Sequence, residues 1–145
     1  MGYIFSYRDV SAVKNMRVMF YEAAKFNSDL SQWDVSSVRN MDSMFYKAES
    51  FNSNLSNWDT SSLTYMVNIF AHANAFNSHL NDWDISNIEK LDGVFYNAKN
   101  FNGNIGNWDV SNVKSMKNMF AGAENFNRNI SNWDVSNVES MGNML

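Results

Sequence analysis

The chain has 145 residues, of which 45% are hydrophobic and 15% aromatic, and it carries a formal net charge of −4. This composition predicts a folded, core-forming domain, and the negative charge excludes a basic surface for nucleic acid or anionic lipid. Cysteine is absent, which excludes disulfides, thiolate zinc sites and a thiol nucleophile. No apolar run reaches the roughly 18 residues of a membrane span, and the N-terminus lacks the pattern of a signal peptide.

A repeat of 25 residues organises the chain, because each tryptophan is followed by the next at this interval and an aspartate follows every tryptophan. The tryptophans are Trp33, Trp58, Trp83, Trp108 and Trp133, and the aspartates, here called the Asp row, are Asp34, Asp59, Asp84, Asp109 and Asp134. An earlier copy has Arg8 in place of tryptophan. A fixed period of this length predicts a solenoid, so residues 1–145 are expected to form a single repeat domain of about five and a half units. The chain starts and stops inside a unit, which predicts a piece of a longer protein.

Each unit is expected to begin with a short strand, for example over 30–35. Trp33 and Val35 alternate with Asp34, which places the two apolar side chains on one face and the carboxylate on the other.

A helix is expected after the strand, over 36–48. Taken at 100° per residue, the apolar side chains of this segment cover an arc of about 120°, the width of a buried helical stripe. Serine is a good N-cap, and Ser86 with Glu89 and Ser136 with Glu139 have the spacing of capping boxes.

A Phe-Asn turn is expected to lead back to the next strand. Its phenylalanines, with the tryptophans and methionines, are predicted to form the core rather than an aromatic platform for a ligand. Its asparagines, Asn27, Asn52, Asn77, Asn102 and Asn127, are predicted to satisfy backbone groups of neighbouring units. Stacked copies would form an α/β solenoid, a leucine-rich-repeat-like stack with a parallel sheet on one side and parallel helices on the other.

The string Phe-Asn-x-x-Leu-Ser-x-Trp-Asp-Val-Ser-Asn-Val-x-x-Met-x-x-Met-Phe-x-x-Ala is clearest over 101–123 and from residue 126. It resembles the BspA-like leucine-rich repeats of bacterial surface proteins and mycoplasma lipoproteins. The resemblance extends over nearly the whole chain. It implies a protein displayed at the cell surface and involved in adhesion or host contact.

The Asp row has two alternative interpretations. Carboxylates on neighbouring strands would be stacked about 4.8 Å apart and would repel one another, so they need compensation. Either each aspartate accepts N–H bonds at the start of a helix, or the row binds calcium. Asp-Val-Ser-Asn offers too few oxygen ligands for a calcium loop by itself, so the first interpretation is favoured and no cofactor is expected. His72 and His79 have no third partner column, and no metal site is predicted there.

The predicted function is non-catalytic, because every candidate Asp or Ser belongs to a repeated column rather than to a convergent set of unlike groups. The predicted module binds a host protein or a surface glycan through an extended face; the alternative is a structural spacer that displays another domain. The candidate ligand-binding residues lie on the expected sheet face and comprise the Asp row together with Asn57, Asp82 and Asn107. An uncapped last unit also predicts end-to-end self-association.

Overall fold

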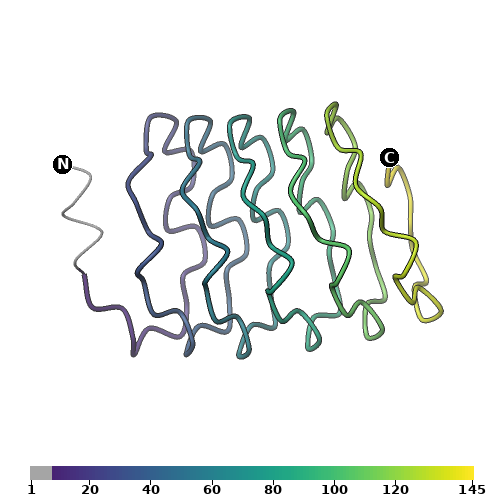
Figure 1. Ribbon diagram of the computed structural model, residues 1–145, viewed down its shortest axis with the longest axis horizontal. Helices are drawn as coiled ribbons and strands as arrows, with labels where there is room; N and C mark the ends of the chain where they lie inside the picture. Colours follow the sequence, from purple (N-terminus) through teal and green to yellow (C-terminus); the bar gives the residue numbers. More distant parts are fainter. Residues whose placement is uncertain (1–7) are drawn as a thin grey trace.

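The computed structural model describes residues 8–145. Successive 25-residue units form coils that lie side by side in a row, with the first described coil at one end of that row and the C-terminus at the other (Figure 1). Each coil contacts the coils before and after it. The side chains of one coil therefore meet the equivalent side chains of the next.

The predicted α/β architecture is wrong. Within residues 8–145 there is no helix and no extended strand, so neither a parallel sheet nor a layer of helices exists. Backbone hydrogen bonds join each coil to the next, but within these residues β-type pairing is limited to isolated parallel bridges. They join Asn15 to Asn40, Asn40 to Tyr65, Lys90 to Ser115 and Ser115 to Ser140.

The segment expected to be helical, 36–48, is a series of tight turns. The Met44 N–H donates to the Met41 carbonyl at 3.1 Å, an i to i−3 bond, whereas the Met41 N–H donates to Tyr65 of the next coil at 2.8 Å. Donors thus alternate between the same coil and its neighbour. An α-helix would direct every N–H to the carbonyl four residues back in its own segment.

Backbone angles explain why this segment cannot be helical. Two residues of most units have positive φ, such as Ser43 at 54° and Lys47 at 56°. Each is the third residue of a turn, where a type II turn requires positive φ. The equivalent positions are often asparagine or glycine, as in Asn68, Gly93 and Asn118, which adopt this region at the lowest cost.

The segment expected to be a strand, 30–35, also consists of turns. The Trp33 N–H donates to the Leu30 carbonyl at 3.1 Å, and the Val38 N–H donates to the Val35 carbonyl at 2.9 Å. The predicted alternation is nevertheless confirmed, because Trp33 and Val35 are buried and Asp34 is exposed.

The core consists of stacked apolar columns, as predicted. Phe45 stacks on Phe51 of its own unit at a centroid distance of 4.1 Å and on Phe70 of the next unit at 5.7 Å. Equivalent pairs recur in every unit from Phe20 to Phe126. The phenylalanine, tryptophan and methionine columns are almost wholly buried except in the end coils, so core packing rather than a ligand platform is confirmed for them.

Side-chain hydrogen bonds tie neighbouring coils together along the stack. The Asn27 Oδ1 accepts the N–H of Asn52 at 2.8 Å, and the same bond repeats down the column to Asn127. This confirms the predicted role of the asparagines. The indole of Trp58 donates to the Leu30 carbonyl at 2.9 Å, with equivalents at Trp83, Trp108 and Trp133. These bonds satisfy polar groups that regular secondary structure would otherwise pair.

Candidate functional site

The Asp row lies on the outside of the stack, with one carboxylate per coil. Asp84 Oδ1 accepts the Ser86 N–H at 3.0 Å and the Ser86 hydroxyl at 2.6 Å. Every other member of the row accepts the N–H of the serine two residues on in the same way. These are side-chain-to-backbone turns. The carboxylates therefore take the N–H bonds that were expected, but they begin turns, and the predicted helix caps are wrong.

These bonds lower the pKa of four carboxyls of the row. The serine hydroxyl, and after it the serine N–H, lowers the pKa of the carboxyl below its usual 3.8 at four members of the row. They are Asp34, Asp59, Asp109 and Asp134. The neighbouring Asp59 and Asp9 charges act on Asp34 in the opposite direction and are weaker. These four carboxyls are therefore ionised at neutral pH.

The other predicted ligand-binding residues, Asn57, Asp82 and Asn107, are exposed next to the Asp row. No three His, Cys, Asp or Glu side chains within residues 8–145 are placed to hold a metal ion together. Two hollows on this surface are lined by other residues, described next. Whether the Asp row and its neighbours bind a ligand stays a prediction.

A polar trench runs across the coils on the side of the Ser-Asn segments. One hollow of about 460 Å³ and another of about 560 Å³ both have Asn87 and Glu89 in their linings, so they adjoin on this side of the stack and are here described together. The polar trench is lined by Asp42, Thr64, Tyr65, Val67, Asn87, Glu89, Lys90, Asn112, Lys114, Asn137 and Glu139. The polar trench lies beside the Asp row, because Asn87 directly follows Ser86, the serine that is hydrogen-bonded to Asp84.

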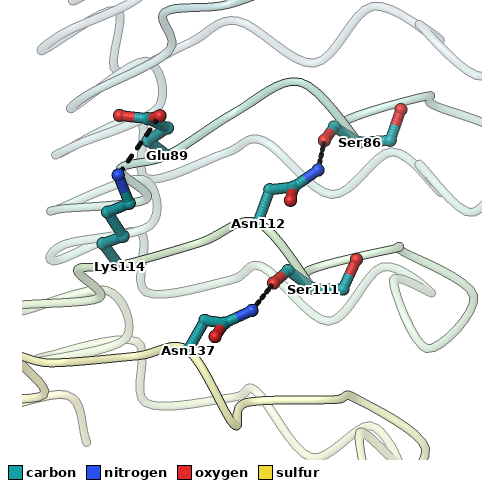
Figure 2. Close-up of polar contacts among 6 residues, drawn as sticks. All are labelled: Ser86, Glu89, Ser111, Asn112, Lys114 and Asn137. Atoms are coloured by element: carbon teal, nitrogen blue, oxygen red, sulfur yellow. Dashed lines mark hydrogen bonds and ion pairs between the residues drawn. The ribbon is translucent and has the colours of Figure 1, made fainter.

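Hydrogen bonds between coils fix the amides of the polar trench. The Asn112 amide donates to the Ser86 carbonyl at 2.7 Å, and the Asn137 amide donates to the Ser111 carbonyl at 2.7 Å (Figure 2). Within residues 8–145, neither amide oxygen accepts a hydrogen bond. The two side chains are thus held in place with an acceptor available to a ligand.

Charges along the polar trench alternate in sign. Lys114 Nζ lies 3.4 Å from Glu89 Oε1, and both side chains are more than half exposed (Figure 2). Glu89 and Glu139 were expected to close capping boxes. They instead line the polar trench, with Glu89 one unit before Lys114 and Glu139 one unit after it.

Tyr65 occupies the other end of the polar trench and is 58% exposed. Asp42, in the same hollow, is half-buried and accepts the Val67 N–H at 2.7 Å. Burial raises the pKa of Asp42, and this effect outweighs the hydrogen bond and the nearby Arg17 charge.

The repeat pattern did not reveal the polar trench, although Tyr65 occupies a column that is otherwise Asn, Lys or Ser. This departure from the repeat is the sequence feature that could have indicated the site.

A second surface feature is a row of partly exposed aromatic rings formed by Tyr21, Tyr46, His72 and Tyr96, with centroids 4.9–5.4 Å apart. Burial, helped by the Lys47 charge, lowers the pKa of His72. His79 lies elsewhere and accepts the Asn104 N–H through Nδ1. The structure does not bring the two histidines together in any cluster of metal-binding groups among residues 8–145.

The fold and the trench define a tandem-repeat protein of stacked coils with a continuous polar surface along the stack. The chain belongs to the family described as Mycoplasma protein of unknown function, DUF285, whose model matches residues 4–89 and 77–145. The family thus establishes a bacterial repeat protein. None of the curated proteins and none of the solved structures compared with the chain matches it. The described residues include no helix that could cross a membrane.

Proposed function

We propose that the chain is a non-catalytic module at a bacterial cell surface that binds a host protein or a surface glycan along the polar trench. The observation that carries this proposal is the regular recurrence of the same polar groups in successive coils at Asn87, Asn112 and Asn137. A repeated surface offers several equivalent contacts to a long ligand, whereas catalysis needs unlike groups converging on one reacting atom. The resemblance to BspA-like repeats, which implies adhesion, supports the same conclusion.

Two exposed ion pairs provide a matched test. Lys114 pairs with Glu89 inside the polar trench, and Lys99 pairs with Glu124 outside it at 4.0 Å with similar exposure. The wild type, Lys114→Ala and Lys99→Ala would be screened on immobilised extracellular-matrix proteins and glycans. We expect Lys114→Ala to weaken binding roughly fivefold or more, and Lys99→Ala to bind as the wild type does. Equal binding by the two variants would remove the polar trench from the proposal.

A structural spacer is the second candidate function. Continuous hydrogen-bonded columns, such as the one from Asn27 to Asn127, join one coil to the next and favour a stiff rod. A spacer predicts no binding on either panel. It also predicts that deleting one 25-residue unit shortens the reach of a displayed reporter domain without further effect.

A further inference from the structure

We propose that the polar trench binds an uncharged, linear polysaccharide, with Tyr65 as the platform on which one sugar ring stacks. This inference rests on the proposed function and names the ligand class of the same site. Four features of the trench support it: an exposed ring, the spacing of the amides, the balance of charges and the lack of an apolar centre.

Tyr65 offers an aromatic surface to a ligand. Tyr65 is 58% exposed, whereas the core aromatics of the interior coils are buried. A sugar ring presents C–H groups on its faces and hydroxyls at its edge. Tyrosine matches this pattern, because its ring offers an apolar surface and its hydroxyl a hydrogen-bonding tip. Thr64, Asn87 and Glu89 around it supply further donors and acceptors for hydroxyls.

The amides of the trench recur at the repeat distance of the coils. Core rings one unit apart, such as Phe70 and Phe95, have centroids 5.9 Å apart, which gives the scale of this repeat. The repeat is comparable with the length of one pyranose residue. Asn112 and Asn137 are already held by Ser86 and Ser111, so a glycan would not have to order them. Preorganised groups of this kind lower the entropic cost of binding.

The charges decide which polysaccharides fit. The lysines Lys90 and Lys114 oppose the carboxylates of Asp42, Glu89 and Glu139 in the polar trench. The chain as a whole is negative, at −4. A polyanion would meet repulsion here, whereas an uncharged glycan hydrogen-bonds equally well to ammonium and carboxylate groups.

The trench also lacks the apolar centre that a protein partner requires. Stable protein interfaces have a desolvated, apolar core surrounded by polar groups. Tyr65 and Val67 are the apolar or aromatic residues that line the polar trench, and both lie at one end of it. Hydroxyl-rich ligands do not need such a core.

The test uses the chain itself with oligosaccharides of increasing length from uncharged β-linked glucans and N-acetylglucosamine polymers, measured by calorimetry. Heparin and a panel of matrix proteins serve as the competing ligand classes. Tyr65→Ala and Tyr65→Phe are compared with Tyr21→Ala. Tyr21 is a matched control, because it is 45% exposed, lies outside the trench and contacts Tyr46 instead.

We expect an uncharged oligosaccharide to bind more tightly as it lengthens. Tyr65→Ala should weaken binding about tenfold, the usual scale for loss of a stacking ring, while Tyr65→Phe and Tyr21→Ala should retain it. Glycan binding that Tyr65→Ala leaves unchanged would overturn this inference. So would binding only to heparin or to proteins, although the proposed function would then survive if Lys114→Ala weakened that binding. Binding to none of the three classes would overturn both.

Discussion

At the residue scale, a carboxylate of the Asp row stabilises one surface turn in each coil. Asp84 accepts two hydrogen bonds from Ser86, whereas its exposed neighbour Asp82 accepts none within the described residues. Comparing the two aspartates therefore tests whether the hydrogen bonds of the carboxylate, rather than its charge alone, stabilise the coil.

Replacing Asp84 by Ala should lower the stability by about 0.5–1 kcal/mol, because the exposed Ser86 N–H loses its partner and water replaces it only in part. Asp82→Ala should change the melting temperature little. Calcium or a chelator should leave all three proteins unchanged. If calcium raised the melting temperature of the wild type but not of Asp84→Ala, the Asp row would be a metal site.

Acid should destabilise the protein through the same carboxylates. Because the pKa values of Asp34, Asp59, Asp109 and Asp134 are lowered on folding, their stabilisation is present above 3.8 and is lost as the pH falls through the folded values. Asp42, with a raised pKa, acts in the opposite direction. Asp9 and Asp29 also have lowered pKa values, so six described carboxyls act in this direction against the one raised value of Asp42. The urea concentration at the unfolding midpoint should therefore decrease as the pH drops below about 4. Carboxyl carbon shifts that titrated at or above 3.8 for the four aspartates would contradict this assignment.

At the element scale, the turns replace helices and strands, and their geometry depends on positive φ. Gly93 has φ of +63°, and a Cβ placed on it would lie 1.9 Å from Asn68 Oδ1 of the preceding coil. Gly142 shows neither constraint, since a Cβ placed on it would have no atom within 4 Å.

Gly93→Ala should therefore destabilise the protein by about 1–2 kcal/mol, the usual cost of a left-handed residue with a side chain, and the contact with Asn68 should add to it. Gly142→Ala should be nearly neutral. Chemical denaturation of the two variants measures the difference. A stable Gly93→Ala would show that the turn adopts another conformation.

At the scale of the whole molecule, stacking decides what is buried. Val110 is 1% exposed and Met116 is buried, whereas the equivalent Val135 and Met141 in the last coil are 38% and 42% exposed. The same residue types thus form core in one coil and surface in the next, depending only on whether another coil covers them.

We accordingly expect this chain to associate end to end, because a second copy could cover the exposed apolar surface of the last coil. Sedimentation velocity should show larger species as the concentration rises. Val135→Asp combined with Met141→Lys should abolish them, while Tyr65→Ser, at an exposed site on the flank of the stack, should not. A single monomeric species at every concentration would contradict the expectation.

Residue columns alone were enough to predict which side chains face inward. Leu30, Trp33 and Val35 are buried as expected, and the asparagines from Asn27 to Asn127 join neighbouring coils. These results follow from the period itself, because any stack with a 25-residue repeat brings equivalent positions together.

The secondary structure and the binding surface depended on the tertiary structure. The spacing of Met41, Met44, Phe45 and Ala48 fits a helical stripe, but consecutive turns bury the same positions. Only the backbone, with its positive φ at Ser43 and Lys47, distinguishes the two. The polar trench likewise requires neighbouring coils, since Asn87, Glu89, Asn112 and Lys114 meet only when separate units are stacked. Local sequence determines which side chains are apolar and where they recur, whereas hydrogen bonds between coils determine the backbone path and the surface it presents.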